Sequence, residues 1–128
     1  MRWLIVSAST LVVILNAPII HAADYSAHLS ASPKSYRGNC PVVIKLNGTI
    51  TSRKKGDVMY TLSRSDGAKV IDETLTFARA GSKRVSRTWT LGDGEFTNYA
   101  GWAAIELLDA DLDPIVTSNK AHFKIHCK

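Results

Sequence analysis

The sequence predicts an all-β fold, an antiparallel sandwich of two packed sheets. After residue 23, apolar and polar residues alternate along most of the chain, and turn residues interrupt this pattern at intervals of about 8–12 positions. None of these stretches has a convincing helical period. The 128 residues allow one domain of ordinary size and leave no room for a two-domain enzyme.

Residues 1–22 have the pattern of a cleavable signal peptide. Arg2 supplies the positive charge, an apolar stretch follows, and Ala22 is the small residue before a cleavage site. Pro18 interrupts the apolar run, which argues against a transmembrane anchor. We therefore expect residues 23–128 to form one secreted domain, periplasmic or extracellular. This mature chain keeps 15 basic and 11 acidic side chains, a net charge of about +4.

The first four expected strands follow from alternation and from the turns between them. Residues 25–32 alternate as far as Pro33, after which residues 33–39 are expected to form a loop. The second and third strands bring their apolar residues to one face, and an Asp-Gly pair then supplies the positive φ of a hairpin. These strands cover 25–32, 41–51, 57–64 and 69–77, with Val42, Ile44, Leu46, Ile50, Val58, Tyr60 and Leu62 inward.

Three further strands complete the domain, at 83–91, 99–108 and 115–127. Arg87 interrupts the inward parity of Val85 and Trp89, which predicts a β-bulge at that position. Seven strands in about 105 residues, with no helix between them, are typical of an immunoglobulin-like sandwich.

The two cysteines, Cys40 and Cys127, are expected to form one disulfide. A secreted domain meets an oxidising environment. If the strands alternate in direction, the strand that follows Cys40 and the strand that contains Cys127 meet at one end of the sandwich. A free catalytic thiol would need a nearby histidine, and His126 points to the opposite strand face.

Several motifs lie at core and turn positions. They are Cys40-Pro41-Val42-Val43-Ile44, Gly48-x-Ile50, Tyr60-x-Leu62-x-Arg64-Ser65-Asp66-Gly67-Ala68, Trp89-Thr90-Leu91, Gly101-Trp102 and Ser118-Asn119-Lys120-Ala121-x-Phe123-x-Ile125-x-Cys127. Over residues 25–127 this series resembles a bacterial secreted immunoglobulin-like domain. The resemblance implies a module that stands alone and has no catalytic residues to carry over.

The first candidate binding site is the basic run Arg53, Lys54 and Lys55, in the turn after the second strand. On the sandwich topology, Arg79 and Lys83 fall at the same end, and so do Asp109, Asp111 and Asp113. These charges either neutralise one another in a solvated rim or present a basic rim to an anionic partner.

The second candidate site lies on the last strand, where His122, Lys124 and His126 share the outer face. The two histidines are separated by about 13 Å along a strand, too far for one metal ion with bonds of about 2 Å. We therefore predict no metal site here. Trp102 either belongs to the core or lies on the same outer face as an exposed contact residue.

Motifs for hydrolysis, phosphate binding, redox chemistry and nucleic-acid recognition are absent from the sequence. We therefore predict a protein that is not an enzyme and needs no cofactor. The leading hypothesis is a secreted immunoglobulin-like module that recognises a protein or an anionic surface polymer, with no specific nucleic-acid partner and no transmembrane segment in the mature form. The alternatives are a structural or antigenic envelope protein with weak, avidity-based interactions and a hydrolase with an unrecognised site.

Overall fold

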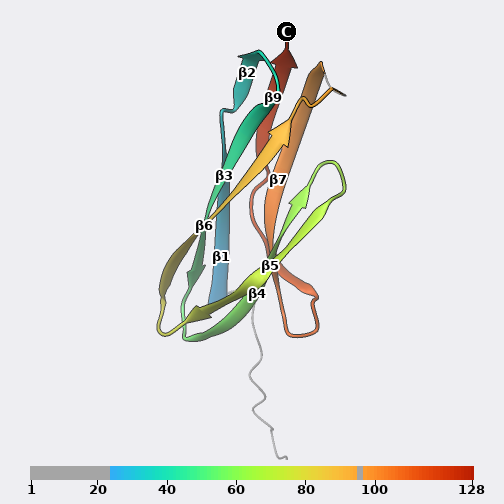
Figure 1. Ribbon diagram of the computed structural model, residues 1–128. Helices are drawn as coiled ribbons and strands as arrows, with labels where there is room; N and C mark the ends of the chain where they lie inside the picture. Colours follow the sequence, from blue (N-terminus) through green and yellow to red (C-terminus); the bar gives the residue numbers. More distant parts are fainter. Residues whose placement is uncertain (1–23, 95–96) are drawn as a thin grey trace, which may run out of the picture.

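The computed structural model describes residues 24–94 and 97–128, so the expected signal peptide, residues 1–22, lies outside the described residues (Figure 1). Within the described part, no helix has the length and apolar character needed to span a membrane. The chain there is organised as strands. They are β1 (Tyr25–Ser32), β2 (Ser35–Gly38), β3 (Val42–Ser52), β4 (Gly56–Arg64), β5 (Lys69–Phe77), β6 (Gly81–Leu91), β7 (Asn98–Leu108), β8 (Pro114–Thr117) and β9 (Ala121–Cys127).

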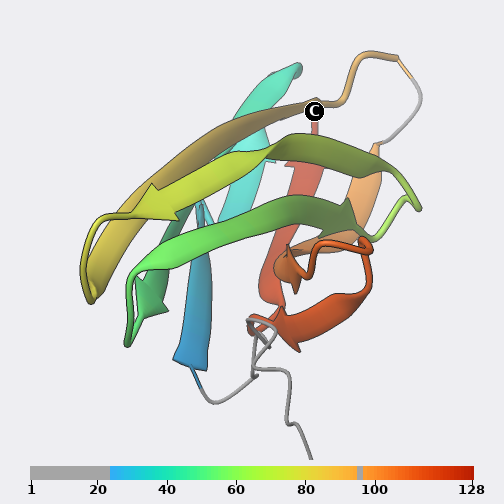
Figure 2. The same cartoon turned by 90° about the horizontal axis from the view of Figure 1, so that it is seen from below.

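The strands form two sheets that pack face to face, which confirms the predicted all-β sandwich. The smaller sheet has the order β1-β3-β6, and the larger has the order β2-β9-β7-β4-β5, with β8 paired to β7. Seen from below, the blue β1 and the red β9 lie in different layers (Figure 2). Each of the two sheets therefore buries one face and leaves the other open to solvent.

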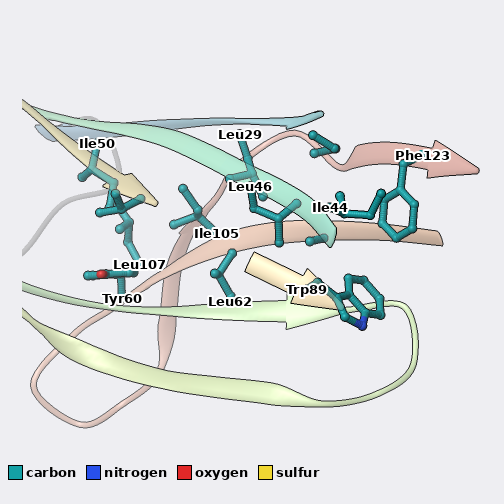
Figure 3. Packing of buried hydrophobic residues seen from close by; sticks show 14 of the residues in the cluster. Leu29, Ile44, Leu46, Ile50, Tyr60, Leu62, Trp89, Ile105, Leu107 and Phe123 are labelled. Atoms are coloured by element: carbon teal, nitrogen blue, oxygen red, sulfur yellow. The ribbon is translucent and has the colours of Figure 1, made fainter. Parts of the chain in front are cut away.

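The core between the sheets follows from the period-two alternation of the sequence. In β3, buried and exposed residues alternate almost without interruption, and Ile44, Leu46 and Ile50 point inward. They face Ile105 and other apolar side chains of β4 and β7, while Trp89 and Phe123 fill one end (Figure 3). The inward residues predicted for the second and third strands are all buried.

The expected seven strands need correction, because the described residues contain nine. The first addition is β2, at positions where a loop was expected. This strand pairs with β9 in parallel, so the sandwich is not purely antiparallel. The chain leaves the smaller sheet after Pro33 and joins the edge of the larger one. Four residues were too few for alternation to be recognised.

The second addition arises because the expected strand 115–127 is divided into β8 and β9. At the break, the Ser118 hydroxyl accepts a hydrogen bond from the Ile105 amide at 2.8 Å. The Asn119 side chain accepts from the Leu29 amide at 2.9 Å and donates to the Leu29 carbonyl at 2.8 Å. These polar side chains take the place of strand pairing and connect the break to both sheets.

The bulge predicted at Arg87 is also wrong. The β3–β6 register is regular over eleven residue pairs, from Val42 opposite Leu91 to Ser52 opposite Gly81. Arg87 keeps its inward parity because its guanidinium donates a hydrogen bond to the Tyr60 hydroxyl at 3.2 Å. A buried hydroxyl therefore accommodates a charged side chain where the sequence suggested a break in the strand.

The predicted disulfide is present. Cys40 and Cys127 are bonded, with their Cα atoms 5.5 Å apart, at the end of the sandwich where β3 begins and β9 finishes. Gly92 has a φ of +85°, and an added Cβ there would lie 2.7 Å from the Cys40 Sγ atom. A side chain at this turn would therefore collide with the bridge.

Candidate functional site

The structure brings the four residues of the second candidate site together on the outer face of the larger sheet. In the antiparallel β7–β9 register, Trp102 lies opposite His122, Ala100 opposite Lys124, and Asn98 opposite His126. The residues between them, Phe123 and Ile125, are buried in the core. The outward parity predicted for these side chains is therefore correct, and Trp102 is half-buried on that face rather than part of the core.

The short strand β2 and the residue before it add two cations that the sequence reasoning missed. Its parallel register places Ser35 opposite Lys124 and Arg37 opposite His126. Lys34 precedes β2, and its carbonyl accepts a hydrogen bond from the Lys124 amide at 2.9 Å. Both cations are exposed. The sequence offered no usable signal for them, because four residues are too few to show alternation and the pairing is supplied by the edge strand β9.

Lys120 extends the cluster toward the beginning of β9. Its ammonium lies 4.4 Å from the centroid of the Trp102 ring, a distance typical of a cation–π contact. The Trp102 backbone is held by the Ser65 hydroxyl, which accepts a hydrogen bond from the Trp102 amide at 3.1 Å. We call this surface the β9 face. It consists of Lys34, Arg37, Trp102, Lys120, His122, Lys124 and His126.

Two adjoining open hollows lie on the β9 face. One, of about 450 Å³, is lined by Arg37, Asn98 and His126 among others, and the second, of about 340 Å³, is lined by Lys34, Trp102 and His122 among others. Ala100 and Lys124 line both. The small side chain of Ala100 leaves room between the cations and the aromatic ring. The face is thus a shallow groove rather than a flat surface.

The β9 face is electropositive. Within residues 24–94 and 97–128, no Asp or Glu lines either hollow. The ion pairs found in the described part of the chain join Lys54 to Asp24, Arg64 to Asp66 and Lys69 to Glu106, all outside this face. The cations of the β9 face therefore point to solvent without acidic partners among the described residues, an arrangement that attracts anions. At His126, Nδ1 is hydrogen-bonded to the Asn98 side-chain oxygen.

The first candidate site, Arg53, Lys54 and Lys55, lies elsewhere. It follows β3, which runs from the disulfide end to the opposite end of the sandwich (Figure 1). At about 3.3 Å per residue, the eleven residues of β3 place the basic rim roughly 36 Å from the end that holds His126. The Lys54 ammonium is 2.9 Å from the Asp24 carboxylate. Of the acidic residues expected at this end, Asp109 lines a hollow with Asp57, near the start of β4.

Comparison with known proteins gives a likeness in fold. No family model matches the sequence, and no curated protein matches it. Among solved structures, the fold is similar to part of the Pseudomonas fluorescens alkylpurine DNA glycosylase AlkC bound to DNA containing an abasic site analog. The TM-score is 0.57 at 11% identity, and the match covers 81% of this chain and 31% of that chain. The chain thus spans about a third of the length of this neighbour.

This neighbour contradicts the function predicted from the sequence, a secreted immunoglobulin-like module that recognises a protein or a surface polymer. The fold recurs in a DNA glycosylase that was solved on DNA. The prediction was wrong because its motifs consist of core and turn residues. Such residues specify a sandwich, and a sandwich supports many unrelated functions. The partner must be inferred from the exposed faces instead.

Proposed function

We propose that this chain is a nucleic-acid-binding module that holds the phosphate backbone of DNA on the β9 face, without sequence specificity. The observation that carries the proposal is the concentration of cations beside the half-buried Trp102 ring, with no acid among the described residues that line the hollows. Each Lys or Arg that neutralises a phosphate releases condensed counterions, which supplies most of the affinity in non-specific DNA binding. The DNA-bound neighbour of similar fold supports the same partner.

The proposal covers binding and no chemistry on the base. The chain spans 31% of the glycosylase chain, so the activity of that protein does not transfer to it. Among the residues that the structure describes, the lining of the groove includes no carboxylate that could act as a general base or stabilise a cationic intermediate. We therefore propose that the module is not itself an enzyme.

Two further expectations from the sequence are kept as proposals. The first is that the sandwich is immunoglobulin-like, which is supported by the strand orders β1-β3-β6 and β2-β9-β7-β4-β5 and by the passage of the chain from one sheet to the other after β1. The second is export, which is supported by the Cys40–Cys127 disulfide because such bonds persist in oxidising compartments. The DNA bound by an exported module would lie in the periplasm or outside the cell.

The test compares two variants with the same loss of charge in different places. The first replaces Lys34, Arg37 and Lys124 by Gln, and the second replaces Arg53, Lys54 and Lys55 by Gln. Binding of fluorescent DNA is measured by anisotropy over a range of salt concentrations. In the first variant we expect the slope of log K against log salt to fall by about 2–3, since each phosphate contact contributes about 0.7–0.9.

The second variant should bind nearly as well as the unchanged protein. If it lost affinity and the first variant did not, the site would be the rim rather than the β9 face. If the unchanged protein did not bind DNA at low salt, the proposed function would be wrong.

A further inference from the structure

The basic side chains of the β9 face are arranged in a row. Lys120, His122, Lys124 and His126 occupy every second position along β9 and the residue before it. Side chains at that spacing share one face of a strand, separated by about 6.6 Å, so the row is about 20 Å long. Lys120, His122 and Lys124 are exposed, and His126 is half-buried.

A second line of charge lies beside this row, on the side away from β7. Arg37 in β2 is the register partner of His126, and Lys34 lines the same hollow as His122 and Lys124. Trp102 lies on the other side of the row, in β7, opposite His122. The groove therefore has a charged side on β2 and β9 and an aromatic side on β7.

We propose that the β9 face binds a single strand of DNA, with phosphates along the row and a base against Trp102. This inference rests on the proposed function and specifies the form of its ligand. One strand of a duplex makes a full turn in about 10 base pairs, so it curves away from a straight row. An extended single strand can follow the whole row.

The indole ring favours a single strand for a second reason. The bases of a duplex are stacked on one another, whereas those of a single strand can stack on aromatic side chains. Trp102 is half-buried, and its backbone is fixed by Ser65. The group over its ring is the flexible, exposed Lys120 side chain. A base that stacks there displaces an ammonium, which remains free to contact the neighbouring phosphate.

The experiment compares a short oligothymidine strand with a mixed-sequence duplex of equal length, each labelled for anisotropy, on the full chain. We expect tighter binding to the single strand. Trp102→Leu should weaken single-strand binding about fivefold or more, the lower end of the loss for one base–aromatic stack, and leave duplex binding unchanged. Trp102→Phe, which keeps a ring, should restore most of the difference. Tryptophan fluorescence should be quenched on binding in the unchanged protein and much less in Trp102→Leu.

A lysine pair provides the matched control. Lys124→Gln should reduce the salt slope for the single strand by about 0.7, whereas Lys45→Gln, at an exposed position in β3 of the other sheet, should not. Equal or tighter binding of the duplex, with Trp102→Leu unaffected, would overturn the single-strand inference and leave the proposed function standing. Failure to bind either form would overturn both.

Discussion

Replacing Trp89 by Ala tests whether the two sheets pack as the structure indicates. Trp89 is 5% exposed and lies edge-to-face against Phe123 at 5.2 Å and against Tyr99 at 6.0 Å between ring centroids. The Arg64 guanidinium lies 4.2 Å from the centre of its ring. The side chain thus joins β6 of the smaller sheet to β4, β7 and β9 of the larger one.

The magnitude follows from this burial. A buried aromatic side chain removes roughly 150–250 Å² from water, which at about 25 cal/mol per Å² corresponds to about 4–6 kcal/mol as an upper bound. Substitutions of Phe or Trp by Ala in cores cost about 3–5 kcal/mol. We therefore expect the free energy of unfolding to fall by about 4 kcal/mol.

The assay is thermal and urea unfolding followed by circular dichroism. A loss of about 4 kcal/mol in a domain of this size lowers Tm by roughly 15–30 °C. The control is Thr90→Ala, at the next position, which is exposed and should change stability by no more than about 0.5 kcal/mol. Equal effects of the two substitutions would refute the register of β6 and with it the description of the core.

Two further predictions concern the disulfide and the stability of the domain in acid. Cys40→Ser removes the bridge that closes a separation of 87 residues and should destabilise the domain by about 2–5 kcal/mol in urea unfolding; an unchanged midpoint would contradict this. The hydrogen bond from the Arg64 side chain lowers the pKa of the Asp66 carboxyl in the folded protein below its usual 3.8. The charged carboxylate therefore stabilises the fold above pH 3.8, and this stabilisation is lost as the pH falls through the lower pKa of the folded state. The Tm difference between the unchanged protein and Asp66→Asn should therefore shrink on acidification below about pH 4.

The sandwich was predictable from the sequence because each long strand buries one face. Alternation identified the inward residues of β3 and β4, and the Asp66-Gly67 turn was recognised from its residue types: the Gly67 amide donates to the Arg64 carbonyl at 3.0 Å, with φ at +86°. The disulfide followed from strand direction. What these features share is that they depend on local pattern and on the order of strands along the chain.

The missed features depend on contacts between distant residues. Nothing within residues 33–39 indicates that β2 pairs with β9, since that pairing is supplied by the edge of the larger sheet. The break at Ser118 likewise depends on the Ile105 amide, and the inward position of Arg87 depends on the Tyr60 hydroxyl. For the candidate site, the sequence identified Trp102, His122, Lys124 and His126 but missed the cations that β2 brings beside them.

The assignment of the site to β9 rather than to the basic rim follows from what each arrangement does for folding. In the rim, Lys54 pairs with Asp24, so at least part of that charge has a partner within the fold. In β9, the inward residues Ala121, Phe123 and Ile125 already provide the packing that holds the strand. The outward basic side chains of β9 point away from this core, and Arg37 lies opposite His126 in the register. A polyanion can neutralise a row of exposed basic side chains along the whole strand, and it is on this ground that we propose the site on β9.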